Sequence, residues 1–411
     1  MKNVETSYPR DKIRVLLLEN VSGSATEVFT AGGYAGVERH ARALGEDELA
    51  EAVRGVHILG IRSKTKVTGR VLAAADRLLA VGAFCIGVNQ VDLRAATSAG
   101  VAVFNAPYSN TRSVAELVIG LAVMLIRRVP DKNAAAHRGV WLKEAKGSYE
   151  LRGKTLGIVG YGNIGSQVSV LAEALGMKVV YYDVVPKLPH GNARQSRDLA
   201  ELLAESHVVT LHVPGGASTR NLIDEAALSL MRPGALLINY SRGDVVDLEA
   251  LANYVRGGAL GGAAVDVFPE EPEKSGDPFR SVLQNLPNVI LTPHVGGSTE
   301  EAQESIGLDV SSKLIQYLEL GTSSGSHTVP AVSLPPQDGT HRILHIHRNV
   351  PGVLAEINSR LSAGGVNILG QYLKTNDAIG YVILDVDTAL SREAVRILRE
   401  AKATLKTRVV Y

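Results

Sequence analysis

Three side chains with complementary chemistry follow three apolar runs in the second half of the chain: Arg242, Glu271 and His294. A histidine, whose ordinary pKa is about 6.5, suits proton transfer near neutral pH. A carboxylate bonded to its other ring nitrogen fixes the tautomer and stabilises the imidazolium. An arginine holds a substrate carboxylate or carbonyl in its fork and, being always charged, takes no part in the proton transfer. Together they suit the oxidation of a hydroxyl beside a carboxylate, provided that a hydride acceptor binds nearby.

A glycine fingerprint supplies a site for that acceptor. Gly160, Gly162 and Gly165 follow an apolar run and open a helical pattern, which is the context in which G-x-G-x-x-G binds a dinucleotide. The helix N-terminus would offer its free N–H groups to the pyrophosphate. Asp183 lies 23 residues beyond Gly160, close to the place of the acid that bonds the ribose hydroxyls. A carboxylate there repels a 2′-phosphate, so the pattern favours NAD over NADP.

Apolar runs that alternate with helical patterns predict parallel sheets with helices on both faces. In the first part of the chain, strands are expected at Ile13–Leu18, Val56–Ile61, Leu78–Gly82 and Val101–Phe104. A second series is expected at Thr155–Val159, Lys178–Tyr182, Val208–Leu211, Ala235–Asn239, Ala263–Val267 and Val289–Leu291. Six strands with interleaved helices is the count of a full doubly wound dinucleotide domain. Since ligands bind beyond the carboxyl ends of such strands, Arg242, Glu271 and His294 are predicted to meet at one rim.

The last 70 or so residues follow another pattern. Strand, helix, strand, strand, helix and strand are expected at His341–His347, Pro351–Ala363, Val366–Lys374, Ile379–Asp387, Arg392–Ala401 and Leu405–Val410, an order typical of a ferredoxin-like module. Gly321–Thr340, rich in Gly, Ser, Thr and Pro, is predicted to be a linker. A long helix, Thr299–Leu320, would return the chain to its first domain. We therefore predict three domains, formed by residues 1–107 with 297–337, by residues 108–296, and by residues 338–411.

The composition indicates an ordinary globular protein of the cytoplasm. Lys and Arg total 43 against 42 acidic residues, so no global charge points to nucleic acid or to a membrane surface. The lone Cys85 lies among apolar residues and is expected to be a core side chain in a reducing compartment. The first residues lack the apolar core of a signal peptide, and the longest apolar run, Leu117–Ile126, is too short for a membrane helix. We predict no metal site.

The segments Asn239–Gly243, Asp266–Pro272 and Thr292–Thr299 resemble motif blocks of the D-isomer-specific 2-hydroxyacid dehydrogenases, and the resemblance spans nearly the whole chain. It implies a flavodoxin-like substrate domain, a Rossmann NAD domain, active-site roles for Arg242 and Glu271, and His294 as the proton donor and acceptor. With the fingerprint, it implies NAD contacts at Gly160, Gly162, Asn163, Ile164, Gly165, Asp183, Tyr240, Ser241, Arg242, Asp266, His294, Val295, Gly296 and Gly297. Tyr240 stands where this family usually has a small residue.

With its C-terminal module, the chain is most similar to bacterial members of this family that oxidise 3-phosphoglycerate to 3-phosphohydroxypyruvate for serine synthesis. A phosphorylated acid requires cations, and Arg62, Ser63 and Lys64 follow the strand Val56–Ile61 at its carboxyl end. Asn110 lies in a polar loop at the domain crossing and is also expected at the substrate. Lys143 belongs to a segment that in the family reaches the neighbouring subunit's cleft. The resemblance thus implies a homo-oligomer, and a homotetramer is favoured.

The C-terminal module resembles an ACT domain, which binds amino acids at a subunit interface. In the family, feedback inhibition by L-serine uses a loop like His347–Gly352 and an asparagine placed like Asn367. Serine is therefore expected to bind His347, Asn349 and Asn367, with Pro351 at the first position of the following helix. A purely structural oligomerisation domain is the alternative.

Two other functions remain open at this stage. Another D-2-hydroxy acid, of the glyoxylate or lactate type, is one alternative to 3-phosphoglycerate, and relatives also reduce 2-oxoglutarate to 2-hydroxyglutarate. A non-catalytic, NAD-sensing corepressor would share the fold and the three active-site residues. Such corepressors lack an amino-acid-binding tail and a pair like Arg62 and Lys64, which favours the enzyme.

Overall fold

A computed structural model describes residues 8–272, 276–336 and 339–410. The chain divides into two compact units, one formed by residues 1–109 with 303–411 and the other by residues 110–302. The predicted limit between residues 337 and 338 lies outside the described residues.

A five-stranded parallel sheet forms the first half of unit 1, in the order β2-β1-β3-β4-β5. Its strands are β1 (Arg14–Leu17), β2 (Gly36–Arg39), β3 (Ile58–Ile61), β4 (Ala80–Ala83) and β5 (Ala102–Asn105). This is the flavodoxin-like order, so the predicted doubly wound fold is confirmed. Strand β2 was not predicted, because its residues lie half-buried or exposed at the sheet edge and carry no apolar pattern.

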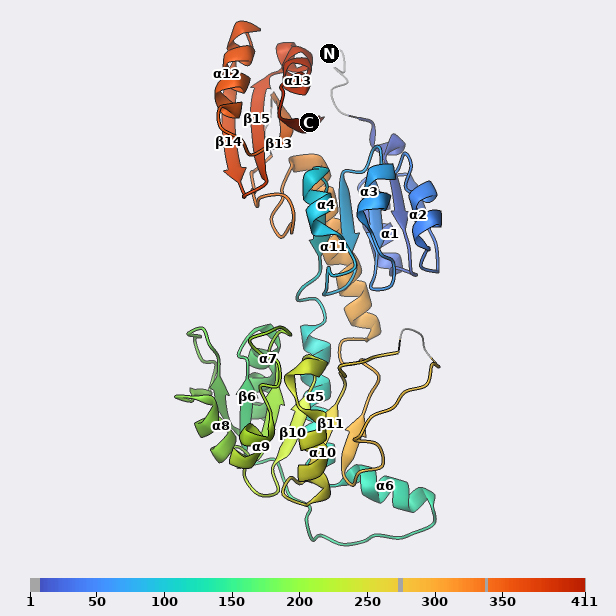
Figure 1. Cartoon of the computed structure of the whole chain (residues 1–411), viewed down its shortest axis with the longest axis vertical. Helices are drawn as coiled ribbons and strands as arrows, with labels where there is room; N and C mark the ends of the chain where they lie inside the picture. The colour runs from blue at the N-terminus through green and yellow to red at the C-terminus, as the bar shows by residue number, and fades with distance from the viewer. Residues whose placement is uncertain (1–7, 273–275, 337–338, 411) are drawn as a thin grey trace. The chain divides into compact units, whose positions relative to one another are not determined.

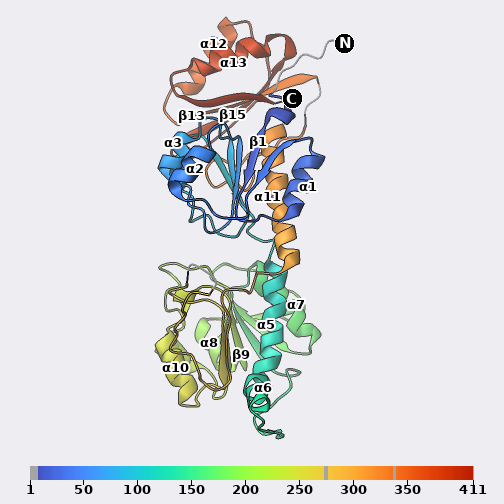
Figure 2. The ribbon, with the colours of Figure 1, turned by 90° about the vertical axis from the view of Figure 1, so that its right-hand side faces the viewer.

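Alternating side chains of this sheet enter two cores, because successive residues of a strand point to opposite faces. Leu16 and Leu18 pack on the side of α2, α3 and α4, and Val15 and Leu17 on the side of α1 and α11. The helices of unit 1's first half are α1 (Gly23–Ala31), α2 (Glu46–Ala52), α3 (Gly69–Ala74), α4 (Leu93–Ser98) and α11 (Glu300–Leu320), with a 3-10 turn η1 (Arg10–Lys12) before β1. Figure 2 shows α2 and α3 on one face of the sheet and α1 and α11 on the other.

The second half of unit 1 is a βαββαβ module with a four-stranded antiparallel sheet, ordered β14-β15-β13-β16. Its elements are β13 (Thr340–Arg348), α12 (Val353–Ala363), β14 (Ile368–Thr375), β15 (Ile379–Asp387), η3 (Thr388–Leu390), α13 (Ser391–Arg399) and β16 (Thr404–Val410). The predicted ferredoxin-like order is confirmed. The expected place of Pro351 is wrong, because α12 begins at Val353 and Gly352, with φ of 88°, is its N-cap.

Two contacts join this module to the rest of unit 1. One face of its sheet packs under α12 and α13, while Tyr381 and Ile383 on the other face enter the core that contains Phe104 and Tyr317. The segment 321–336 has no helix or strand, but it is packed rather than free, because the buried Thr328 bonds to Val101 and Val103 next to and within β5.

A buried ion pair also connects the module to the segment that precedes it. The Arg342 guanidinium donates to both carboxylate oxygens of Asp385, at 2.8 and 3.0 Å, and to the carbonyl of Pro335 at 3.0 Å. The two charged side chains are only 3% and 1% exposed. A buried pair needs its remaining donors satisfied, and here the connecting segment supplies the acceptor.

Unit 2 contains a seven-stranded parallel sheet in the order β12-β11-β10-β9-β6-β7-β8. Its strands are β6 (Thr155–Val159), β7 (Lys178–Tyr182), β8 (Arg194–Gln195), β9 (Val208–Leu211), β10 (Leu236–Asn239), β11 (Gly262–Val265) and β12 (Val289–Leu291). All six predicted strands are present, and the exposed, two-residue β8 is added at one edge. Strand order reverses between β6 and β9, which is where dinucleotides bind in such sheets.

Helices cover both faces of this sheet (Figures 1 and 2). They are α5 (Thr111–Ile126), α6 (Val129–His137), α7 (Asn163–Ala174), α8 (Leu199–Glu205), α9 (Glu225–Leu230) and α10 (Leu248–Arg256), with a 3-10 turn η2 (Gly243–Val245). Apolar residues of α5 and α7 form one core, and those of α8, α9 and α10 form the other. Within the described ranges, no helix is both long enough and apolar enough to span a membrane.

Candidate active site

His294 and Glu271 form a direct pair beyond the carboxyl ends of β12 and β11. The Nδ1 atom of His294 lies 2.7 Å from Oε2 of Glu271. The other oxygen, Oε1, accepts the backbone N–H of Phe268 at 3.0 Å, which fixes the carboxylate relative to its own loop. The His294 side chain is 52% exposed, and its Nε2 atom has no partner in the described part of the chain. Nε2 is thus available to a substrate hydroxyl.

The two groups shift each other's pKa in opposite directions. The hydrogen bond that His294 donates to Glu271 raises the pKa of His294 above its ordinary value, against the effect of burial and of the Arg242 charge. Burial acts to raise the pKa of Glu271, but the bonds from His294 and Phe268 outweigh it, so the net pKa is lowered. Glu271 therefore stays ionised near neutral pH and favours the protonated imidazole.

Asp266 holds the turn that carries His294. It is 2% exposed, and its carboxylate accepts the N–H groups of Val295 and Gly296, both at 2.8 Å. Its backbone carbonyl accepts the N–H of His294 at 2.8 Å. His294 itself has φ of 54°, a left-handed conformation that is uncommon for a residue other than glycine, asparagine or aspartate. These three bonds offset the cost of that conformation.

Tyr240 belongs to the same network. Its hydroxyl lies 2.6 Å from Oγ1 of Thr292, which in turn donates to Oδ1 of Asp266 at 2.6 Å. Burial raises the pKa of Tyr240 to about 12, so the hydroxyl stays protonated. The tyrosine found in place of the family's usual small residue thus supports the Asp266 carboxylate through Thr292.

Arg242 follows β10 on a turn that hydrogen bonds to Asn239 hold in place. The buried Asn239 accepts the N–H and the hydroxyl of Ser241 at 3.1 and 2.8 Å, and it donates to the carbonyl of Arg242 at 3.0 Å. One guanidinium nitrogen, Nη1, donates to the carbonyl of Ser241 at 2.6 Å. The rest of this exposed side chain makes no ion pair with any described residue. It is close enough for its charge to lower the pKa of both Glu271 and His294.

The glycine fingerprint has the geometry that a dinucleotide needs. Gly160 has φ of 93°, and a Cβ at Gly165 would overlap the carbonyl oxygen of Gly160. A Cβ at Gly162 would meet open space, and α7 begins at the next residue, so the backbone is accessible at the helix N-terminus. Asp183 directly follows β7, and its oxygens accept the N–H groups of Tyr161 and Val185, both at 2.9 Å. The residues present therefore fit the ribose and pyrophosphate of NAD.

The remaining predicted cofactor residues divide into two groups. Asn163 and Ile164 form the first turn of α7, beside the fingerprint. Ser241, Val295, Gly296 and Gly297 belong to the two turns that carry Arg242 and His294. The structure thus brings the fingerprint and the proton-transfer pair to the same edge of one sheet, at the ends of parallel strands.

Arg62, Ser63 and Lys64 form a loop after β3 in unit 1. Glu19, a residue with φ of 61° that directly follows the apolar run 15–18, accepts the N–H groups of Arg62, Lys64 and Thr65 at 3.0, 2.9 and 2.8 Å. Gln90 donates to the carbonyl of Arg62 at 2.8 Å. The Arg62 guanidinium and the Lys64 ammonium have no ion-pair partner among residues 8–272, 276–336 and 339–410. Hydrogen bonds thus hold the backbone of this loop, while the charged groups of Arg62 and Lys64 remain without an ion-pair partner among the described residues.

The other two predicted substrate residues lie at opposite ends of α5. The amide of Asn110, just before the helix, contacts Gly297 of the His294 turn. The segment with Lys143 returns to the far end, where the N–H of Tyr149 bonds to the carbonyl of Ile126 at 3.0 Å. A helix of 16 residues spans about 24 Å, so the segment that carries Lys143 is not brought to the site of its own unit. Next to it, Trp141 is 83% exposed.

The predicted serine residues lie at the end of β13 and before β14. Asn349 is exposed and donates to the carbonyl of Asn376 at 2.7 Å, and Asn367 is exposed. His347 is buried; its Nδ1 bonds to the carbonyl of Arg348 at 2.8 Å, while its Nε2 is without a partner in the described residues.

Several residues of the site were missed by the sequence analysis. These residues form hydrogen bonds that hold the loops of the site and take no part in the proposed reaction. They are Glu19, Gln90, Asn239 and Thr292. Only Glu19 had a signal in the sequence, since a carboxylate directly after a fully apolar strand is expected to find buried donors.

Comparison with known proteins agrees with this geometry. Residues 119–296 match the family model of the D-isomer specific 2-hydroxyacid dehydrogenase, NAD binding domain, and residues 343–406 match an AHAS small subunit-like ACT domain. The chain is 50% identical to the D-3-phosphoglycerate dehydrogenase of Haemophilus influenzae over 99% of both chains. It is 51% identical to that of Escherichia coli K12, over 99% of this chain and 100% of the relative.

The chain belongs to the D-isomer specific 2-hydroxyacid dehydrogenases. Residues 119–296 are its NAD-binding domain, and residues 343–406 lie in its ACT domain. Among solved structures, the TT0316 protein of Thermus thermophilus covers 77% of this chain at 33% identity and a TM-score of 0.67, with all of its own chain covered. The D-lactate dehydrogenase of Aquifex aeolicus, complexed with NAD and lactic acid, covers 77% at 26% identity and a TM-score of 0.63, again over 100% of its own chain.

The raised pKa of His294 leads to a first prediction. If His294 is the base, oxidation requires its neutral form, so the rate should rise with pH through an apparent pKa above 6.5. The variant Glu271→Gln keeps the size of the side chain but removes its charge. It should move this midpoint to lower pH and lower kcat by roughly tenfold to a hundredfold, the value of a bond to a charged partner. A pH profile of kcat checks both effects, and an unshifted midpoint would contradict the pairing.

Proposed function

We propose that this protein is an NAD-dependent enzyme that oxidises 3-phospho-D-glycerate to 3-phosphohydroxypyruvate for L-serine synthesis. The observation that carries the proposal is the pair of His294 and Glu271 beside Arg242, at the edge of a sheet with an NAD fingerprint. Full-length similarity to D-3-phosphoglycerate dehydrogenases supports the substrate. We also propose the three-domain division predicted from the sequence, with a substrate, an NAD and an ACT domain.

In the proposed reaction each residue of the site has one task. Bound NAD would accept the hydride from the substrate's C2 carbon. Nε2 of His294 takes the hydroxyl proton, and Glu271 stabilises the imidazolium that results. The free guanidinium nitrogens of Arg242 hold the substrate carboxylate and so orient the C2 hydrogen. Asp183 receives the ribose hydroxyls, and the N-terminus of α7 receives the pyrophosphate.

The phosphate of the substrate is assigned to the loop after β3. Two observations support Arg62, Ser63 and Lys64 in this role: their cations lack carboxylate partners, and Glu19 and Gln90 hold their backbone in place. A rigid loop presents charge without an ordering cost when the anion binds. Asn110, whose amide lies beside Gly297, is also assigned to the substrate.

We further propose a homo-oligomer, a tetramer built from dimers. Lys143 lies at the far end of α5 from its own His294, on a segment where Val140, Trp141 and Leu142 are exposed, and exposed apolar side chains of this kind mark interfaces. Lys143 is therefore assigned to the site of a neighbouring subunit. In the ACT domain, edge strand β14 exposes Leu369 and Leu373 and offers a second interface.

The proposed location is the cytoplasm.

Serine is the proposed effector of the ACT domain. His347 and Asn349 lie at one end of the ACT sheet and the exposed Asn367 lies at the other, because Ile368 pairs with Val386 whereas His347 pairs with Gly380. The three residues would therefore meet only across the edge of the module, between two ACT domains. Their amides and the unpaired Nε2 of His347 suit the carboxylate and amine of an amino acid.

Reduction of 2-oxoglutarate to 2-hydroxyglutarate is retained as a side activity, because the same Arg242 and His294 serve any 2-oxo acid. A glyoxylate or lactate enzyme is less well supported, since neither acid carries a phosphate for Arg62 and Lys64. A non-catalytic corepressor is least supported, because such proteins lack an amino-acid-binding tail like the ACT domain at residues 343–406 and a pair of cations like Arg62 and Lys64.

The phosphate assignment predicts a substrate-selective defect. Arg62→Gln should raise KM for 3-phosphohydroxypyruvate by roughly tenfold to a hundredfold, the loss of one charge-assisted bond. KM for hydroxypyruvate, which lacks the phosphate, should stay within about twofold of the unmodified enzyme. Arg70→Gln is the matched control, since Arg70 in the same unit is already paired with Asp47. Equal losses on both substrates would reject the assignment, and no activity on either substrate in the unmodified protein would reject the function.

Serine regulation is tested separately. L-serine should lower the rate of 3-phosphoglycerate oxidation, and Asn349→Ala should raise the inhibitory concentration by roughly tenfold through lost hydrogen bonds. D-serine serves as the ligand control. An active enzyme whose rate does not change with L-serine would leave the ACT domain with a structural role only.

A further inference from the structure

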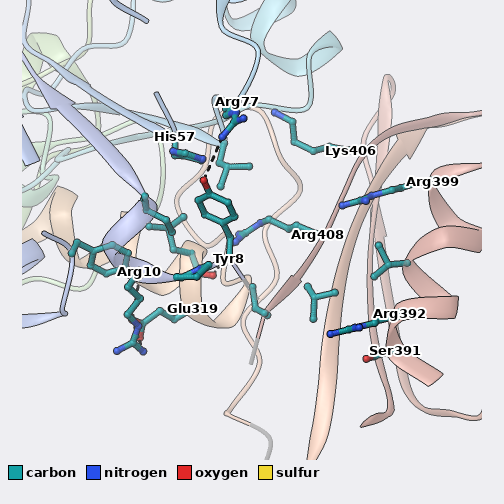
Figure 3. A pocket seen from close by; sticks show the side chains of 18 of the residues that line it. Tyr8, Arg10, His57, Arg77, Glu319, Ser391, Arg392, Arg399, Lys406 and Arg408 are labelled. Carbon is teal, nitrogen blue, oxygen red and sulfur yellow. Dashed lines mark hydrogen bonds and ion pairs between the residues drawn. The ribbon is translucent and has the colours of Figure 1, made fainter. Parts of the chain in front are cut away.

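A cavity of about 790 Å³ lies within unit 1, away from all the residues considered above. It opens between the amino ends of β1, β3 and β4, the end of α11, and the ACT elements α13 and β16. Figure 3 shows side chains from both halves of the unit pointing into it. A volume of this size is typical of small-molecule sites.

The lining of this cavity is strongly basic. Six basic side chains line it, namely Arg10, Arg77, Arg392, Arg399, Lys406 and Arg408. Among the described residues, only two carboxylates do so, Asp76 and Glu319. In a chain with a net charge of +1, this is a local concentration of positive charge that needs its own explanation.

The two carboxylates neutralise only one of these cations. Glu319 pairs with Arg10 at 2.9 Å and accepts the hydroxyl of Tyr34 at 3.2 Å. Asp76 accepts the backbone N–H of Gly55 at 2.7 Å. For the other five cations, no ion pair joins them to a carboxylate of the described ranges.

Helix α13 shows that this arrangement is selective. Arg392, Val395 and Arg399 line the cavity, at the spacing of one helical face. Arg396, on the other face, is paired with Glu393 and Glu400 at 2.9 and 2.8 Å. The helix therefore neutralises the arginine that points away from the cavity, and it leaves without an ion pair the two arginines that Figure 3 shows extending from α13 into the cavity.

Strand β16 contributes two cations at the floor of the cavity. Lys406 donates to the carbonyl of Leu78, and Arg408 donates to the carbonyls of Tyr317 and Leu318, the latter at 2.9 Å. Burial, with the charge of Arg408, lowers the pKa of Lys406 to about 8. Two half-buried cations side by side repel each other, and an anion would relieve that cost.

The cavity is distinct from the proposed phosphate-binding loop of the same unit. His57, which lines it, directly precedes β3, whereas Arg62 directly follows that strand. The cavity thus lies at the amino edge of the five-stranded sheet and the proposed phosphate loop at the carboxyl edge.

We infer that this cavity binds a small molecule with two or more phosphate groups, which joins the ACT domain to the substrate domain. Arginine forks match phosphate oxygens in pairs, and five unneutralised cations suit three or four negative charges rather than one. The rings of Tyr8 and His57, tilted by 33° with their centroids 5.2 Å apart, add aromatic surface against which an attached organic group can pack. The ligand would contact α13 and β16 on one side and Arg77 on the other.

The experiment is calorimetric titration of the full-length protein with inorganic tripolyphosphate at constant ionic strength. Saturating NADH is present throughout, so that the pyrophosphate site is filled. The double variant Arg392→Gln/Arg399→Gln is compared with Arg396→Gln on the same helix, and Arg399→Gln alone is a milder variant. All three changes replace an exposed arginine by another good helix former, so the fold should be retained. ADP and citrate are titrated in parallel to separate nucleotide, inorganic phosphate and carboxylate ligands.

We expect one tripolyphosphate per chain, with Kd raised at least about tenfold in the double variant and unchanged in Arg396→Gln. Tighter binding of ADP would point to a nucleotide. Absence of binding, an equal loss in Arg396→Gln, or a preference for citrate over tripolyphosphate would overturn the inference. Because no measurement depends on turnover, failure here leaves the proposed dehydrogenase function untouched, and the reverse also holds.

Discussion

The contact between Nδ1 of His294 and the carboxylate of Glu271 is the interaction on which the site depends. It leaves Nε2 free and sets the direction in which the histidine pKa moves. The two residues come from the ends of different strands, so the contact requires the parallel sheet to be in register. It also requires the turn at His294 to keep a left-handed conformation, which Asp266 enforces with its carboxylate and its carbonyl. The tautomer of His294 is thus fixed with the help of the buried hydrogen bonds that Asp266 accepts from the His294 turn.

Much of this arrangement could be predicted from the sequence, for a physical reason. In a parallel sheet all strands end at one edge, so residues that follow apolar runs are brought together whatever their separation along the chain. This rule was sufficient to predict that Arg242, Glu271 and His294 lie at one edge of the sheet. It was also sufficient to place the glycine fingerprint and Asp183 at that edge. It also gave the order of the ferredoxin-like module, because strand and helix periods differ clearly there.

What could not be predicted depends on side-chain direction or on contacts without periodic pattern. Gln90 and Asn239 act through bonds to backbone groups, which leave no spacing signal in the sequence. Strand β2 lacks apolar alternation because it lies at the edge. Helix α12 begins at Val353 rather than at Pro351, because Gly352 adopts a positive φ that only the backbone reveals. The basic cavity joins Arg77 to residues beyond position 390, and no local pattern connects segments so far apart.

The most direct test of the account replaces the imidazole alone. His294→Asn is the suitable variant, since asparagine tolerates the left-handed backbone that most residues do not. Single-turnover oxidation of 3-phosphoglycerate, followed by NADH absorbance, should slow by roughly 10²–10⁴-fold, the usual contribution of a general base. NADH binding, measured by fluorescence on the same sample, should be unchanged. Hydride transfer that persists at close to the original rate would show that His294 is not the base, and would contradict the account at its centre.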